Sequence, residues 1–177
     1  MLSDLKPSIL AELAVAIALA AVLSLIKIKL PHLIYGGSIS LHALPIVVVA
    51  LRYGVRLGAL SGVAYGLVNF LLTPYFVHPV QIALDYPVAF GSLGVAGLAA
   101  GRSTPGMAVA AVLGAGALRL GIHVLSGVVY FADLAPADTP VWEYSLIYNS
   151  SYMIPETLIT CLAMGALIRR LPPGVNR

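Results

Sequence analysis

The sequence has little of what soluble and catalytic proteins usually depend on. Only 10% of its 177 residues are charged, whereas a typical soluble domain has about a quarter, so the composition argues against that class. There is a single cysteine, Cys161, which excludes a disulfide framework, and we expect it to be a small packing residue. The net charge of +3 is spread along the chain without a basic cluster. That distribution argues against a nucleic-acid partner.

Motifs for chemistry are missing as well. The chain contains no Walker or other nucleotide-binding sequence, no G-x-S-x-G turn and no H-E-x-x-H pair. We therefore expect no enzyme, no cofactor and no metal site, and any energised transport would need ATPase partners. The less favoured alternatives are a ligand-free scaffold and a small intramembrane enzyme. Such an enzyme would use Glu12, His123 or Glu156 as its acid or base.

Long apolar runs dominate instead. Hydrophobic residues make up 60% of the chain, and about 20 apolar residues suffice for a membrane-spanning helix. We predict an all-α membrane protein with one membrane-embedded domain, residues 1–177. Its six predicted transmembrane helices cover residues 8–26, 39–53, 55–72, 80–100, 106–131 and 141–171. The first run lacks the cleavage pattern of a signal peptide, so we treat it as a true span.

Positive charges gather at the helix ends on one side of the predicted bundle. They are Lys6, Arg52, Arg56, Arg102, Arg169, Arg170 and Arg177. The other side carries Asp133, Asp138 and Glu143, with Lys27 and Lys29 as the exceptions. Because cytoplasmic loops carry the excess of Lys and Arg, we predict that both termini are cytoplasmic.

Polar residues at membrane depth are few, and such residues usually face the bundle interior and mark functional sites. Asp85, His123, Tyr144 and Asn149 fall at a similar depth in the outer half of the predicted bundle. An acid, an imidazole, a phenol and an amide suit a small, planar, nitrogen-rich heterocycle, since they accept and donate hydrogen bonds and stack on rings. Gly127 would let such a ring lie close to the backbone.

Internal pairing is the alternative for the remaining buried charges. Arg119 is placed to neutralise either Glu12 or Glu156, and the sequence leaves both partners open. His123 is the expected partner of Asp85 when no ligand is bound, because an isolated carboxylate in apolar surroundings is costly.

Small residues recur at helical spacing in three places. They are Gly54, Gly58, Gly62 and Gly66, then Gly91, Gly94 and Gly97, and finally Ala14 and Ala18. Such stripes let a neighbouring backbone approach closely. We predict packing within the bundle for the glycines. For the alanines, packing and a docking face for a partner subunit in the membrane are both open.

Five segments, in order and with similar spacing, resemble the membrane-embedded S components of energy-coupling factor (ECF) vitamin transporters, especially the thiamine-specific family. They are LAELAVAIALAAVLSL (10–25), LPIVVVALRYG (44–54), LDYPVAFGSLGVAGL (84–98), HVLSGVVYF (123–131) and YSLIYN (144–149). The resemblance implies a six-helix protein of the prokaryotic plasma membrane that captures thiamine or a related vitamin from outside. It also implies membrane lipids, a transmembrane coupling subunit and two ATPase subunits as partners.

The same resemblance implies roles for individual residues. Ligand contacts are expected from Asp85, Tyr86, His123, Gly127, Phe131, Tyr144 and Asn149. On the first helix, Ala14 and Ala18 match the face on which the family docks its coupling subunit.

This chain departs from the thiamine-specific family at four positions. It has Asp85 where the family has Glu, and Phe131 where the family has Trp. The family's Trp and Glu ahead of the second helix fall on Gly36 and Ser40. The residues expected to gate or complete the site are Tyr35, Ser40, His42 and Trp142. Thiamine is the predicted ligand, and its aminopyrimidine or thiazole precursor is the alternative.

Overall fold

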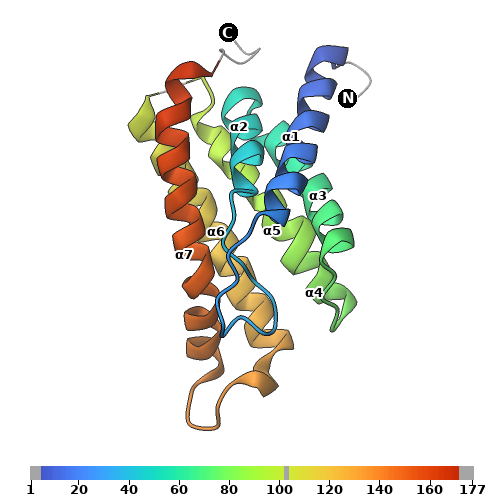
Figure 1. Cartoon of the computed structure of the whole chain (residues 1–177), viewed down its shortest axis with the longest axis vertical. Coiled ribbons are helices and arrows are strands. Elements are labelled where there is room, and N and C mark those ends of the chain that lie inside the picture. The colour runs from blue at the N-terminus through green and yellow to red at the C-terminus, as the bar shows by residue number, and fades with distance from the viewer. Residues whose placement is uncertain (1–4, 102–103, 172–177) are drawn as a thin grey trace.

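The computed structural model describes residues 5–101 and 104–171, which form a bundle of helices (Figure 1). The elements that build it are α1 (Pro7–Leu25), α2 (Ala43–Tyr53), α3 (Val55–Leu72), the composite fourth span (Pro79–Ala99), α6 (Pro105–Tyr130) and α7 (Val141–Leu167). In the described part of the chain, five of these are long and apolar enough to cross a membrane, and α2 is shorter. The predicted all-α membrane class is confirmed. Arg102 and Arg177, two of the positive charges on which the predicted orientation rests, lie outside the described residues.

The second helix is shorter than the predicted 39–53. α2 begins at Ala43 and has 11 residues, and about 17 Å of helix cannot cross a hydrocarbon core of about 30 Å. Ahead of it, Ile28 and Ile39 pair in an antiparallel bridge, and Gly36 and Gly37 turn the loop between them with φ of 114° and 87°. The apolar character of Ile39 therefore reflects packing of an extended segment against a cluster around Leu33, not a helical turn.

The fourth span changes its helical type along its length. It consists of α4 (Pro79–Ala83), the π-helical turn η1 (Leu84–Val88), α5 (Ala89–Gly91) and the 3₁₀ helix η2 (Ser92–Ala99). Pro87 lies inside the π turn. A proline has no backbone N–H and its ring disturbs the regular hydrogen-bond ladder, so a widened turn accommodates it. The same turn carries Asp85.

Glycines let α3 and the fourth span pack backbone against backbone. A Cβ on Gly62 would lie 2.1 Å from the carbonyl oxygen of Phe90, and one on Gly94 would lie 2.4 Å from the amide nitrogen of Ala59. The packing role predicted for the two glycine stripes is confirmed at these positions. Gly54 is different: it forms the α2–α3 turn at φ 86°, and a Cβ there would meet nothing within 4 Å.

The two ends of the bundle differ. The start of α1 and the end of α7 lie together at one end, at the top of Figure 1. The loop between α1 and α2 and the loop between α6 and α7 extend toward the other end. After α7, a short 3₁₀ turn, η4 (Ile168–Arg170), ends the described chain near the predicted boundary at residue 171.

Candidate functional site

A cavity of about 360 Å³ opens among the fourth span, α6, α7 and the loop that follows α1. This volume lies in the range of small-molecule sites, about 300–1,000 Å³. The lining includes all seven residues expected to contact a ligand, namely Asp85, Tyr86, His123, Gly127, Phe131, Tyr144 and Asn149. The fold thus brings together side chains from three separate helices. Their contacts with a ligand stay a prediction.

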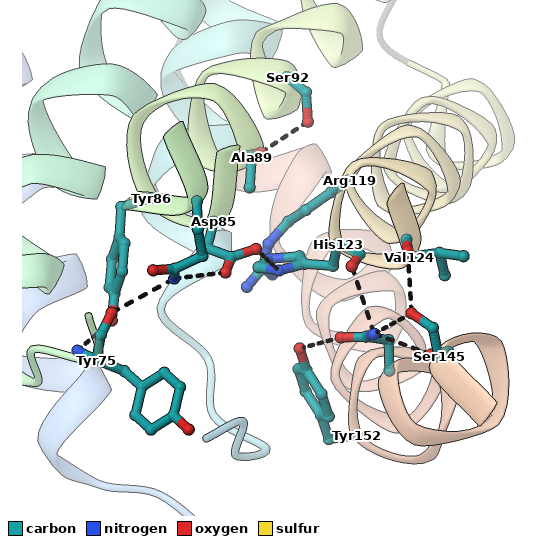
Figure 2. Close-up of polar contacts among 12 residues, drawn as sticks. Tyr75, Asp85, Tyr86, Ala89, Ser92, Arg119, His123, Val124, Ser145 and Tyr152 are labelled. Carbon is teal, nitrogen blue, oxygen red and sulfur yellow. Dashed lines mark hydrogen bonds and ion pairs between the residues drawn. The ribbon is translucent and has the colours of Figure 1, made fainter. Parts of the chain in front are cut away.

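Asp85 is held from two sides. Its Oδ2 accepts a hydrogen bond of 2.7 Å from Nε2 of Gln81, and its Oδ1 lies 3.1 Å from Nδ1 of His123. Figure 2 shows Asp85 on the fourth span facing His123 on α6. A carboxylate in a protein interior is costly unless it is hydrogen-bonded, and these two contacts offset that cost. The expected Asp85–His123 pairing is confirmed.

The second ring nitrogen of His123 is available for another partner. Nε2 is buried and has no hydrogen-bond partner among the described residues. A buried polar atom without a partner costs free energy. Because His123 lines the cavity, a polar group of a ligand there would recover that free energy.

Asn149 is positioned by residues of its own helix, α7. Its Nδ2 donates to the carbonyl oxygen of Ser145, and its Oδ1 accepts from the hydroxyl of Tyr152, both at 2.9 Å. The glycine predicted to admit a ligand ring, Gly127, also has a packing role. A Cβ on Gly127 would lie 2.1 Å from Oγ of Ser145, so glycine at this position lets α6 and α7 approach closely.

One side of the cavity, here called the aromatic wall, is formed by Tyr75, Tyr86 and Phe131. Of these, Tyr75 was not predicted from the sequence. Tyr86 lines the cavity, but its hydroxyl donates to the carbonyl oxygen of Thr73 and accepts from the amide of Tyr75, both at 3.0 Å. These bonds hold the loop between α3 and α4. The ring of Tyr75 stacks on that of Phe131, with 5.8 Å between centroids and 27° between planes. Tyr75 lies in a loop, so no helical spacing in the sequence could indicate that it lines the cavity.

A tyrosine on α7 holds the loop that follows α1. The hydroxyl of Tyr148 donates to the carbonyl oxygen of Gly36 at 2.9 Å and accepts from the amide of Tyr35 at 3.2 Å. Gly37 presses against Tyr152, since a Cβ there would lie 2.7 Å from the ring. The tyrosine spacing on this helix was visible in the sequence, but its attachment to the loop was not.

Two of the four residues expected to gate the site line the cavity. They are Tyr35 and His42, whereas Ser40 and Trp142 do not. Ser40 is buried in a hydrogen bond with the ring of His42. Trp142 is 59% exposed in the first turn of α7. It lies about 10 Å along the helix axis from Asn149, so the structure does not bring it to the site.

A buried charged cluster lies one helical turn from His123 along α6. Arg119 pairs with Glu156 of α7, and Nε2 of His42 lies 3.3 Å from both partners. Of the two partners left open for Arg119, the structure gives Glu156, while Glu12 pairs with Arg52. In the described ranges, 5–101 and 104–171, no three His, Cys, Asp or Glu side chains come together to hold a metal ion.

A helical bundle with membrane-spanning helices and a polar, aromatic-walled cavity between them defines a membrane-embedded protein that binds a small molecule. Comparison with known proteins gives the family. The model of the Thiamine transporter protein (Thia_YuaJ) family matches residues 10–175, and the chain belongs to this family. It is accordingly a multi-pass protein of the cell membrane and a transporter component, not an enzyme.

Two curated relatives and two solved structures illustrate the likeness. The thiamine transporter ThiT of Bacillus subtilis is 37% identical over 175 residues, covering 92% of this chain and 91% of that protein. ThiT of Lacticaseibacillus paracasei is 29% identical over 181 residues, covering 93% and 88%. The structure of ThiT from Listeria monocytogenes has a TM-score of 0.83 at 24% identity, covering 93% of this chain and 94% of that one. An S component of a bacterial ECF transporter has a TM-score of 0.66 at 19% identity, covering 92% and 94%, which shows the same fold.

Proposed function

We propose that this chain is the substrate-binding (S) subunit of an ECF-type transporter and that it captures thiamine from outside the cell for uptake. The family match and the 37% identity to a thiamine transporter support the ligand. The fold shared with a solved S component supports the type of subunit.

The observation that carries this proposal is the Asp85–His123 pair, with its unsatisfied Nε2, inside an aromatic-walled cavity. Thiamine joins a cationic thiazolium ring to an aminopyrimidine ring that both donates and accepts hydrogen bonds. A carboxylate attracts the cation or accepts from the amino group, the free imidazole nitrogen pairs with a second polar group, and aromatic faces bind flat rings. The side chain of Asp85 is only 16% exposed, so water weakens these interactions little.

The charge of the buried cluster also suits a cationic ligand. Arg119 lines the cavity, and an unpaired guanidinium there would repel a thiazolium ring. Its pairing with Glu156 neutralises that charge. The negative charge of Asp85 then favours binding of a cation in the cavity.

We propose further that the cavity faces the outside and that both termini are cytoplasmic. The start of α1 and the end of α7 lie at the same end of the bundle, and the cavity-lining loop after α1 extends away from that end (Figure 1). Lys6 directly precedes α1, and Arg169 and Arg170 lie in η4, the short helix that follows α7. This placement supports the orientation by the positive-inside rule.

Energy for uptake would come from a transmembrane coupling subunit and two ATPase subunits. The chain contains no nucleotide-binding motif. Ala14 and Ala18 are exposed on α1, and a small-residue face lets another helix approach closely in the membrane. We propose that this face docks the coupling subunit.

Calorimetry of the purified protein tests the ligand. We expect one thiamine to bind per chain, with little heat from the aminopyrimidine or the thiazole precursor alone. Heat with a precursor but none with thiamine would overturn the ligand assignment.

Uptake of labelled thiamine in cells that also contain the coupling module tests the docking face. Replacing Ala14 and Ala18 with Leu should abolish uptake and leave thiamine binding intact. Ala110→Leu is the matched control, because Ala110 is an exposed small residue on another helix, α6. Preserved uptake in the double variant would return the alanines to a packing role.

A further inference from the structure

Gln81 is a buried polar residue of α4 that neither the composition nor the resemblance singles out. Its side chain is 1% exposed. Oε1 accepts a hydrogen bond of 3.1 Å from the amide of Val77, and Nε2 donates to the carbonyl oxygen of Tyr75 at 3.4 Å. The shortest contact is the 2.7 Å bond from Nε2 to Oδ2 of Asp85. Both ends of the amide are therefore engaged.

The backbone fixes which way this amide points. The amide of Val77 can only donate, so the oxygen of Gln81 must face it and the NH₂ group must face Asp85. The opposite orientation would place the NH₂ group against an N–H donor and an oxygen against a carboxylate. The donor that Asp85 receives is thus set by the main chain of the preceding loop.

Gln81 and His123 together determine the orientation of the Asp85 carboxylate. Gln81 precedes Asp85 by four residues, so the two side chains lie on neighbouring turns of one helix face. It binds Oδ2, while His123 on α6 contacts Oδ1. A carboxylate held at both oxygens is oriented before a ligand arrives, which reduces the entropy lost on binding.

The same side chain connects the carboxylate to the aromatic wall. Gln81 contacts the backbone of Tyr75 and Val77, and the ring of Tyr75 stacks on that of Phe131 in the cavity lining. Because the backbone of this loop holds both ends of the Gln81 amide, movement of the loop would change the donor offered to Asp85. The two walls of the cavity are therefore linked through one amide.

We infer that Gln81 is a positioning residue for ligand binding: it orients the Asp85 carboxylate and couples it to the Tyr75–Phe131 wall. The inference rests on the proposed function, because it assigns a role in thiamine binding to a residue that acts through Asp85. If Gln81 served only to stabilise the fold, its removal would lower affinity equally with and without Asp85.

A double-mutant cycle separates the two roles. Gln81→Met keeps the size of the side chain and removes both ends of the amide. We expect it to weaken thiamine binding about tenfold in the wild-type background, the effect of losing a hydrogen bond to a charged group. In an Asp85→Ala background we expect the same change to weaken binding less than about twofold, since its main partner is already absent.

Two further variants complete the test. Gln81→Asn is one methylene shorter and cannot join Val77 to Asp85, so it should weaken binding in the same direction if Gln81→Met does not fold. Thr160→Val is the matched control, because Thr160 is equally buried, donates only to the carbonyl oxygen of Glu156, and lies outside the cavity lining. It should leave affinity unchanged.

Equal losses in both backgrounds, unchanged affinity in the Gln81 variants, or unfolding of both variants would each overturn the inference. Failure of the wild-type protein to bind thiamine would overturn the proposed function and the inference with it. Binding by the wild type together with any of the first three results would overturn the inference alone.

Discussion

The fourth span passes through two regions that are built in opposite ways. At one end, Ala89–Ala99 packs against α3 in a glycine seam, where Gly62 and Gly94 bring the two backbones into contact. At the other end, Pro79–Val88 carries Gln81, Asp85 and Tyr86, which hold neighbouring elements by hydrogen bonds around a cavity. The backbone packing continues into the cavity half, since a Cβ on Gly66 would lie 2.5 Å from the carbonyl oxygen of Tyr86. The side chains of the two halves differ: those of one half leave room for α3, and those of the other line the cavity.

The difference shows how this membrane protein keeps a cavity open. Lipid provides no hydrophobic driving force between helices, so their association depends on close packing. The glycines of the seam allow this packing because they have no side chain between the two backbones. The cavity end has large polar and aromatic residues whose hydrogen bonds fix their positions. Substitutions in the seam should therefore affect folding, and substitutions at the cavity should affect binding.

The largest effect is expected in the glycine seam. Gly94→Val would place a branched side chain where even a Cβ lies 2.4 Å from the amide nitrogen of Ala59, at a cost of about 3 kcal/mol or more. We expect loss of the folded, monodisperse protein in detergent, measured by thermal unfolding and gel filtration. Gly114→Ala is the control, since a Cβ at Gly114 meets nothing within 4 Å. A stable Gly94→Val variant would remove the distinction between the two regions.

The next effect belongs to the cavity. Asp85→Ala and Asn149→Ala should each weaken thiamine binding by more than about 1.4 kcal/mol, a factor of ten. Both should retain the unfolding temperature of the wild type to within a few degrees, because the seam is untouched. Calorimetry and thermal unfolding on the same samples check both parts. Wild-type affinity in both variants would show that the cavity is not the thiamine site.

A smaller effect is expected where α7 holds the loop over the cavity. Tyr148→Phe removes the hydroxyl that bonds Gly36 and Tyr35. A net loss of about 0.6 kcal/mol corresponds to about threefold weaker binding, and because the loop is released it should appear as faster dissociation. Stopped-flow exchange of labelled thiamine measures that rate. An unchanged dissociation rate would mean that these bonds do not retain the ligand.

The smallest effect is predicted for Trp142. The residue is 59% exposed and outside the cavity lining, so Trp142→Phe should leave thiamine affinity within about twofold of the wild type. A tenfold loss in the same titration would show that the first turn of α7 moves onto the ligand.

The sequence predicts the helical architecture and part of the cavity well, for physical reasons. Apolar runs set the spans, and depth along three spans was enough to group Asp85, His123 and Asn149. The start of α2 was misplaced because Ile39 is equally apolar in an extended segment and in a helix. Such a residue carries no signal that separates the two conformations.

Contacts that depend on loop geometry or on helix rotation could not be predicted in this way. Tyr75 stacks on Phe131 from a loop whose backbone is held by Tyr86 and Gln81. The choice of Glu156 as partner of Arg119 depends on how α6 and α7 face each other, which the spacing within each helix does not specify. The four-residue spacing of Gln81 and Asp85 indicates that the two side chains lie on one helix face. It points to Gln81 as a partner of Asp85 only after Asp85 has been chosen as a site residue.

We propose that thiamine binds in the cavity between the fourth span, α6 and α7. The most direct test is an experimental structure of the protein with thiamine bound. We expect ligand density within hydrogen-bond distance, about 3.2 Å, of polar atoms of Asp85 or His123 and of Asn149, with a ring of thiamine against the aromatic wall. Density for thiamine elsewhere, such as the groove between α1 and α2 that is lined by Ala11, Val49 and Arg52, would contradict this proposal.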